Sequence, residues 1–75
     1  MVEFSGERIN ELRKSEGLSQ REFSKRLRVT EVTLSRWIRG ERVPKCSDLA
    51  LICNTFKIWP GYFFIQVNEN SEIIT

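Results

Sequence analysis

The sequence predicts an all-α domain built from five short helices. Its apolar residues recur at spacings of three and four, which is the period of an α-helix. Serine, threonine and glycine residues flank these apolar stretches, and such residues commonly begin and end helices. The chain has 75 residues, of which 40% are hydrophobic. We therefore expect one compact domain near the lower size limit for folding without a disulfide or a metal ion.

The first two helices are predicted from their caps. Ser5 is expected to cap a helix over residues 6–16, and Gly17 to end it in the left-handed conformation. Ser19 is expected to begin a second helix, because Glu22 follows three residues later and completes a capping box. The predicted inward-facing residues of these two helices are Ile9, Leu12, Phe23 and Leu27.

A third helix is predicted after a three-residue turn. Residues 28–30 form the turn, Thr30 caps the helix over residues 31–39, and Gly40 ends it. The apolar stripe of this helix consists of Leu34, Trp37 and Ile38, and the residues off the stripe are Glu31, Val32, Ser35, Arg36 and Arg39. Two helices joined in this way, the second of them amphipathic, fit the major groove of DNA. The alternative is an ordinary helical bundle.

Two further helices are predicted beyond a loop that contains Pro44. Ser47 is expected to cap a fourth helix, and Trp59 and Pro60 to begin a fifth, short one, since proline suits a first helical position. The inward-facing residues of the fourth helix are expected to be Leu49, Ile52, Cys53 and Phe56. Phe63 is expected to pack back on the core.

The last residues allow two interpretations. Residues 64–67 and 71–74 flank the polar stretch 68–70, which is typical of a β-hairpin. A short strand followed by a frayed end fits the same sequence. We assign residues 1–64 to the helical domain and residues 65–75 to a C-terminal tail, which as a strand or hairpin would contribute to dimerisation.

Positive charge is concentrated between residues 21 and 45. The net charge of the whole chain is only +2, but this window holds eight basic and three acidic residues and nets +5. The remainder holds four basic and seven acidic residues and nets −3. Such asymmetry favours a polyanionic partner, although a solvated helix face also carries charge of this kind.

Several other classes of protein are disfavoured. The chain has no histidine, no phosphate-binding glycine loop and no nucleophile spaced from a base, so we expect no enzymatic activity. Cys46 and Cys53 are too few ligands for zinc, and we expect two reduced thiols and no cofactor. No apolar run approaches the ~20 residues of a membrane span. The first residues do not resemble a signal peptide, so we expect a cytoplasmic protein.

The order of these features resembles the lambda-repressor-like, Cro-type (XRE-like) helix-turn-helix family of phage and bacterial regulators. The resemblance extends from about residue 9 to residue 64. It is carried by Leu18-Ser19-Gln20, Val29-Thr30, Leu34-Ser35-Arg36-Trp37, Arg39-Gly40, Pro44, Leu49, Ile52 and Ile58. It implies a compact five-helix DNA-binding domain whose recognition helix covers residues 31–39.

The resemblance also implies which residues contact DNA. The positions that match base-contacting residues are Glu31, Val32, Ser35 and Arg36. Arginine can donate two hydrogen bonds to guanine, glutamate can accept one from the cytosine amino group, and valine can contact the thymine methyl group. The candidates for phosphate contacts are Gln20, Thr30, Arg39, Arg42 and Lys45.

Three residues depart from the family pattern. Arg28 and Lys57 replace the glycines that are usual after the second and fourth helices. If the backbone is left-handed there, each costs on the order of 1 kcal/mol relative to glycine. Ile38 replaces a glutamate that often pairs with an arginine of the first helix. Arg13 occupies the position of that arginine, and its alternative partners are Glu41, a backbone carbonyl or solvent.

An aromatic cluster near the end of the domain indicates a dimer. The cluster consists of Trp59, Tyr62, Phe63 and Phe64, of which a monomer of this size is expected to bury two completely. The surplus makes Trp59, Tyr62 and Phe64 candidates for a dimer interface. The alternative is that the tail folds back over these rings within the monomer.

We therefore expect a sequence-specific transcriptional regulator, most simply a phage or bacterial repressor. As a homodimer it would bind an inverted-repeat operator on double-stranded DNA through the major groove. The alternative is a protein-interaction module or antitoxin-type protein that binds a partner through the aromatic cluster and Val32 without reading DNA.

Overall fold

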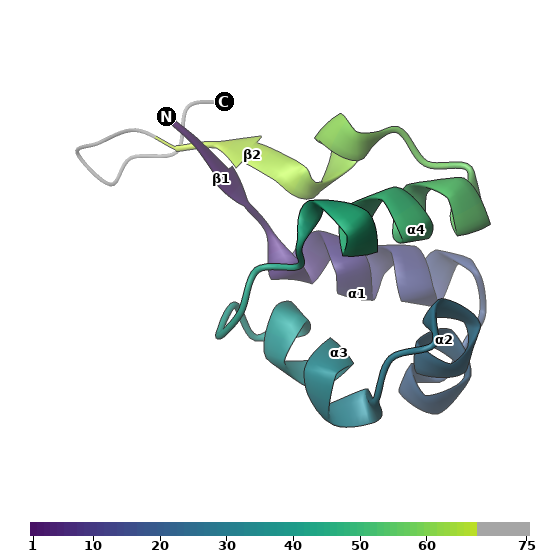
Figure 1. Ribbon diagram of the computed structural model, residues 1–75. Coiled ribbons are helices and arrows are strands. Elements are labelled where there is room, and N and C mark those ends of the chain that lie inside the picture. Colours follow the sequence, from purple (N-terminus) through teal and green to yellow (C-terminus); the bar gives the residue numbers. More distant parts are fainter. Residues whose placement is uncertain (68–75) are drawn as a thin grey trace.

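The computed structural model describes residues 1–67, which form four α-helices, a 3₁₀ turn and a two-stranded antiparallel sheet (Figure 1). The elements in chain order are β1 (Val2–Phe4), α1 (Gly6–Ser15), α2 (Gln20–Leu27), α3 (Glu31–Ile38), α4 (Cys46–Phe56), η1 (Pro60–Phe63) and β2 (Phe64–Gln66). The expectation of five helices in an all-α fold is right for the first four. The fifth is in the expected place, with Trp59 as its N-cap and Pro60 as its first residue, but it is a 3₁₀ turn and not an α-helix, and the expectation omits β1.

The predicted capping box at the start of α2 is confirmed. The Ser19 hydroxyl accepts a hydrogen bond from the Glu22 backbone N–H at 3.1 Å, and the Ser19 N–H donates to the Glu22 carboxylate at 2.9 Å. The hydrogen bonds from Ser19 lower the pKa of Glu22. At α1 the expected cap is only half right, because Ser5 occupies the N-cap position but its hydroxyl makes no capping hydrogen bond.

The predicted start of α4 is wrong by two residues. The helix begins at Cys46 with Lys45 as its N-cap, and Ser47 lies in its first turn. The Lys45 backbone N–H donates to the Asp48 carboxylate at 3.1 Å. That carboxylate, three residues into the helix, satisfies the first backbone donor without a serine cap.

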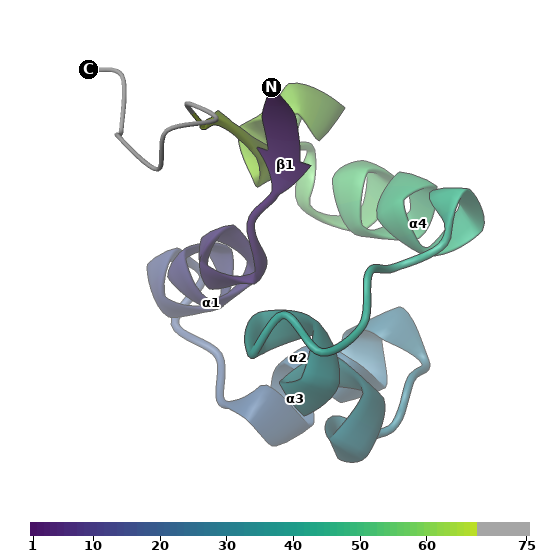
Figure 2. The same cartoon turned by 90° about the vertical axis from the view of Figure 1, so that its left-hand side faces the viewer.

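The core lies between the four helices (Figure 2), and η1 closes it against α1 and α4. Its buried apolar residues are Ile9, Leu12, Phe23, Leu27, Leu34, Trp37, Ile52, Cys53, Phe56 and Phe63. The rings of Phe23 and Phe56 stack with their centroids 4.8 Å apart and join α2 to α4. Ile38 and Leu49, which were expected in the core, are only partly buried at its margin.

The two ends of the described chain meet in a small sheet. Strand β1 pairs with β2 in the antiparallel sense, with Phe4 opposite Phe64. The two rings meet edge to face, with 5.9 Å between centroids. Beyond the pair, the Val67 N–H donates to the Met1 carbonyl at 2.7 Å. The strand expected at the start of the tail is therefore present. The second strand of the proposed hairpin, at 71–74, lies outside the described residues.

Helices α1 and α3 approach each other closely at Gly6. A Cβ atom built on Gly6 would lie 2.1 Å from the Trp37 carbonyl oxygen and 2.6 Å from that of Ile38. Both oxygens belong to the last turn of α3. No side chain fits between the start of α1 and the end of α3, so this contact fixes how the two helices pack.

We expect Gly6→Ala to lower the free energy of unfolding by about 1–3 kcal/mol, because the added methyl group meets backbone that cannot rotate away. The matched control is Gly61→Ala, whose Cβ would meet only the ring of Trp59. That ring is 76% exposed and free to move, so the control should change stability by no more than about 0.5 kcal/mol. Urea unfolding measures both. Equal effects of the two substitutions would contradict the close α1–α3 contact.

Candidate nucleic-acid interface

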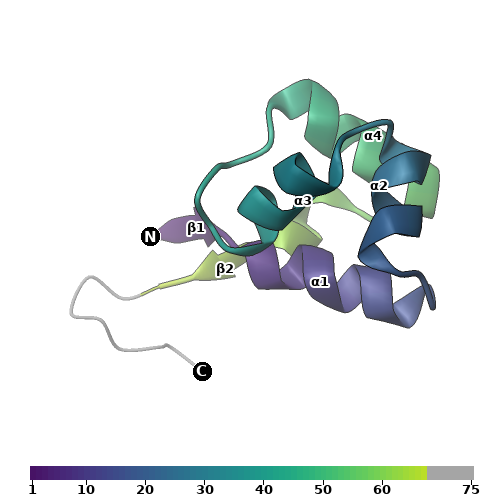
Figure 3. The ribbon, with the colours of Figure 1, turned by 90° about the horizontal axis from the view of Figure 1, so that it is seen from below.

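Helix α3 presents one polar face to solvent. Leu34 and Trp37 are buried in the core, whereas Glu31, Val32 and Arg36 are exposed. Val32 is 60% exposed, although it is apolar. Helices α2 and α3 lie side by side at the bottom of the molecule in Figure 1, below the sheet, and they face the viewer when it is seen from below (Figure 3). The structure thus brings the four predicted base-contacting residues, including the half-buried Ser35, onto a single short helix.

The turn before α3 has the left-handed backbone that was considered for Arg28 from the sequence. Arg28 is left-handed, with φ 58° and ψ 37°, and its N–H donates to the Lys25 carbonyl at 3.1 Å. Thr30 then caps α3, as predicted: its hydroxyl accepts from the Thr33 N–H at 3.1 Å. The same hydroxyl lies 3.0 Å from the Thr33 hydroxyl. These contacts fix where the recognition helix begins relative to α2.

At its other end, α3 is closed by Gly40. This residue has φ +77°, a value that favours glycine. Its N–H donates to the Trp37 carbonyl at 3.1 Å, and the Glu41 N–H donates back to the Arg36 carbonyl at 2.9 Å. These two bonds form a Schellman motif. The chain therefore reverses direction, and Glu41 returns to the side of the last helical turn.

Glu41 forms an ion pair with Arg39 at this point. The Arg39 Nε donates to one carboxylate oxygen at 2.7 Å, and Nη2 donates to the other at 3.3 Å. The remaining Arg39 nitrogen, Nη1, donates to the Ser35 hydroxyl. The pairing raises the pKa of Arg39 and lowers that of Glu41. The pairing of Arg39 with Glu41 was not predicted from the sequence. Gly40 could have indicated it, because a glycine at the end of a helix predicts a chain reversal that returns the next residue to the last turn.

Arg13 uses the backbone alternative among its expected partners. Its Nη1 donates to the Leu18 carbonyl at 2.7 Å, and its Nε donates to the Asn10 side chain at 3.1 Å. Glu41 instead pairs with Arg39. Arg13 therefore supports the connection between α1 and α2 and makes no contribution to the exposed face of α3.

The predicted phosphate contacts flank α3. Gln20 is the half-buried first residue of α2, and Thr30 is the N-cap of α3. Arg42 and Lys45 are exposed in the segment between α3 and α4. They border a hollow of about 230 Å³, which is lined by Thr33, Trp37, Arg42, Val43, Lys45 and Asp48. The hollow thus adjoins the recognition helix and carries two cationic side chains.

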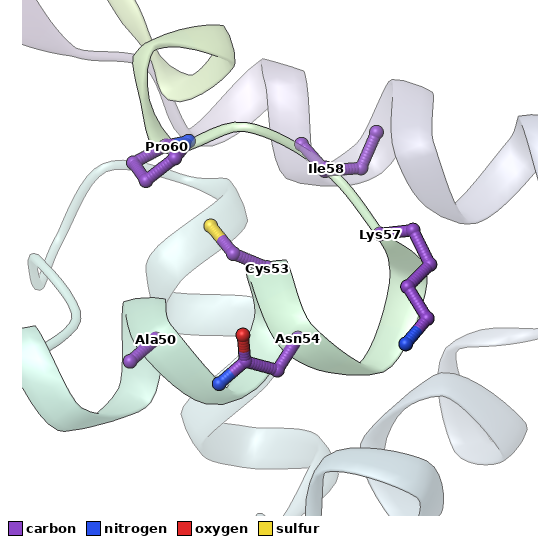
Figure 4. A pocket seen from close by; sticks show the side chains of 6 residues that line it. All are labelled: Ala50, Cys53, Asn54, Lys57, Ile58 and Pro60. Atoms are coloured by element: carbon purple, nitrogen blue, oxygen red, sulfur yellow. The ribbon is translucent and has the colours of Figure 1, made fainter.

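A second hollow lies on the other side of α4. Its volume is about 600 Å³, and it is lined by Ala50, Cys53, Asn54, Lys57, Ile58 and Pro60 (Figure 4). Helix α4 supplies the first three of these residues, and the segment that follows supplies the others. Lys57 is left-handed, with φ 58°, as its place in the sequence suggested. Burial raises the pKa of the Cys53 thiol.

The aromatic cluster is less buried than expected. Phe63 is fully buried, but Trp59 is 76% exposed and Phe64 is 38% exposed. Tyr62 is half-buried, with the Arg8 guanidinium carbon 5.3 Å from its ring centroid. The described chain therefore buries one ring of this cluster completely, where two were expected. The larger hollow is lined by Ile58 and Pro60, the neighbours of Trp59 in the sequence, whereas the Trp59 ring lies over Gly61.

Two other features are absent from residues 1–67. No group of three or more histidine, cysteine, aspartate or glutamate side chains in this range could hold a metal ion. Within the same residues, no helix is both long enough and apolar enough to cross a membrane.

Comparison with known proteins identifies the family. A helix-turn-helix family model matches residues 9–63. The P22 c2 repressor, whose crystal structure contains a synthetic operator, is 30% identical over 81% of this chain and 92% of its own, with a TM-score of 0.73. The restriction-modification controller protein C.AhdI from Aeromonas hydrophila is 24% identical over 77% of this chain and 88% of its own, with a TM-score of 0.70.

No curated protein sequence matches the chain. The family match nevertheless covers most of its length, from Ile9 within α1 to Phe63 at the end of η1. The chain belongs to the XRE/Cro/lambda-repressor-like helix-turn-helix family, a non-enzymatic family of DNA-binding transcriptional regulators.

Proposed function

We propose that this protein represses transcription in a bacterial or phage-infected cell by binding an inverted-repeat operator as a homodimer. The observation that carries the proposal is the outward face of α3, where Glu31, Val32 and Arg36 are exposed on a helix whose other face is fixed in the core. The P22 c2 repressor, a relative with the same fold, was crystallised with a synthetic operator. The cytoplasm is the compartment in which such a protein would act.

The exposed side chains of α3 suit direct readout of bases. Arg36 can donate two hydrogen bonds to guanine O6 and N7, and Glu31 can accept one from a cytosine amino group. Val32 offers an apolar surface for a thymine methyl group, which would account for an exposed valine on a polar face. Ser35 accepts a hydrogen bond from Arg39 and retains its own hydroxyl hydrogen for donation to a base.

Phosphate contacts would fix the position of α3 in the groove. Gln20 and Thr30 lie at the N-termini of α2 and α3, where backbone N–H groups favour anions. Arg42 and Lys45 extend this positive surface beyond the C-terminus of α3. These contacts provide affinity that depends on salt, and they carry no sequence information of their own.

The homodimer would use the aromatic cluster. Trp59 is a large ring exposed to solvent, and Phe64 is exposed on strand β2, which follows the same 3₁₀ turn. Covering Trp59, Tyr62 and Phe64 with a second copy would remove this apolar surface from water. Two-fold symmetry would then place two α3 helices in successive major grooves, ~34 Å apart.

A second candidate function is binding of a protein partner, as in antitoxins. The exposure of Trp59 favours it, because the same ring could contact a different protein. This candidate and the leading one differ in their dependence on DNA. Salt-dependent, sequence-selective binding to duplex DNA is expected only of the leading one.

Arg36→Ala is expected to weaken binding to a selected operator by about 1–3 kcal/mol and to relax the preference at one base position per half-site. Arg42→Ala is the matched comparison, because it removes the same charge from a predicted phosphate contact. It should weaken binding to all sequences alike and reduce the salt slope by about 0.9 per subunit. Fluorescence anisotropy on single-base operator variants measures both effects. An unchanged base preference in Arg36→Ala would show that this residue reads no base.

Trp59→Ala is expected to shift the protein from dimer toward monomer without lowering its stability, because the ring is exposed in the single chain. The matched control is Val43→Ala, which shortens another exposed apolar side chain, on the α3–α4 segment. Analytical ultracentrifugation over a range of concentrations measures the dissociation constant. A dimer that dissociates equally in both variants would place the interface elsewhere.

A further inference from the structure

We propose that Glu41 keeps Arg39 away from the DNA backbone and holds it against Ser35, so that Glu41 supports the readout of a base by Ser35. Arg39 then acts as a positioning residue for Ser35, in contrast to the phosphate contact expected from the sequence. The inference rests on the proposed DNA-binding function and concerns the C-terminal end of the recognition helix.

Three of the five N–H donors of the Arg39 guanidinium are engaged, one on each nitrogen. Nε and Nη2 donate to the two oxygens of Glu41, and Nη1 donates to the hydroxyl of Ser35. A guanidinium that faces a carboxylate with two nitrogens is held more firmly than one with a single hydrogen bond. A DNA phosphate would have to displace the carboxylate in order to take the same donors.

The backbone holds Glu41 in this place. Its N–H donates to the Arg36 carbonyl at 2.9 Å, and Gly40 supplies the left-handed turn that allows this bond. The carboxylate is therefore presented to Arg39 by a fixed chain reversal, and the pairing does not depend on the approach of two flexible segments. Lys45 and Arg42 are exposed in the same segment without a comparable carboxylate pair in the described chain.

The pairing changes the charge that α3 offers to DNA. Non-specific affinity grows with the number of phosphates that cationic side chains neutralise. The Arg39–Glu41 pair carries no net charge, so Glu41 lowers this non-specific affinity. Arg36 is exposed and forms no ion pair with Glu41 in the described chain, although its charge helps to lower the pKa of Glu41. Because a phosphate contact strengthens binding to all sequences alike, the pairing changes the overall affinity and its salt dependence, and the base contacts set the ratio of specific to non-specific binding.

The pairing also defines the role of Ser35. Its oxygen accepts from Arg39, which leaves its hydrogen available to an acceptor on a base edge. Arg39 thereby orients a base-contacting residue from within the protein.

The test compares the full-length wild type with Glu41→Gln, Arg39→Ala and the control Glu11→Gln, which makes the same charge change at an exposed position of α1. Affinity for a selected operator and for a scrambled duplex is measured over a series of salt concentrations. Far-ultraviolet circular dichroism with urea unfolding checks that each variant folds as the wild type does. The ¹⁵N–¹H resonance of the Arg39 Nε is followed in the free protein and in the complex.

We expect Arg39→Ala to keep the wild-type salt slope, and Glu41→Gln to steepen it by about 0.9 per subunit on both duplexes, since the freed arginine gains a phosphate. Glu41→Gln should also lower the ratio of specific to non-specific binding severalfold relative to Glu11→Gln, because an Arg39 that has left Glu41 for a phosphate no longer orients Ser35 toward a base. The Arg39 Nε resonance should persist unchanged when DNA binds to the wild type.

The inference is overturned if Arg39→Ala reduces the salt slope by about 0.9 while Glu41→Gln behaves as Glu11→Gln does. Arg39 would then be an ordinary phosphate ligand. A wild type that selects no DNA sequence would overturn the proposed function, and this inference with it. Whether the wild-type protein selects a DNA sequence therefore distinguishes failure of the proposed function from failure of this inference.

Discussion

The burial of Leu34 and Trp37 is the constraint on which the rest of the structure depends. These two side chains fix the rotation of α3 about its own axis, because both lie in the core formed with the other helices. The absence of a side chain at Gly6 lets α1 contact the last turn of α3 directly. Once this rotation is set, the exposure of Glu31, Val32 and Arg36 follows from the period of the helix.

The two ends of α3 are fixed by different means, and each has a consequence for function. At its start, Arg28 adopts the left-handed conformation at a cost that glycine would avoid, and Thr30 satisfies the first backbone donors. At its end, Gly40 turns the chain so that Glu41 meets Arg39. The start sets the angle between α2 and α3, whereas the end sets the charge that the helix presents.

The sequence predicts α1–α3 well because their signals are local. The capping box of Ser19 and Glu22 and the cap at Thr30 are decided by residues three positions apart, and the structure has both. The start of α4 was misplaced because Asp48 satisfies the Lys45 backbone in place of a Ser47 cap. The placement of the candidate base contacts on one exposed face could be predicted for the same reason, since it follows from helical periodicity.

Features that depend on distant or alternative partners could not be predicted in this way. Strand β1 has three residues, and its partner β2 lies some sixty positions further along the chain, so no short pattern reveals it. Arg13 could have bonded to Glu41, to a backbone carbonyl or to solvent. The fold decides among them, because it places the Leu18 carbonyl beside Arg13 and Glu41 beside Arg39. The pairing of Arg39 was likewise set by the fold, since arginine in a basic segment otherwise indicates a phosphate contact.

Two copies of this chain are proposed to read duplex DNA through α3. The proposal is tested by selecting the sequences that the 75-residue protein binds from a random duplex pool. We expect enrichment of an inverted repeat whose half-sites are centred about one helical turn, ~34 Å, apart. Recovery of no enriched sequence, or of a single unrepeated half-site, would contradict it.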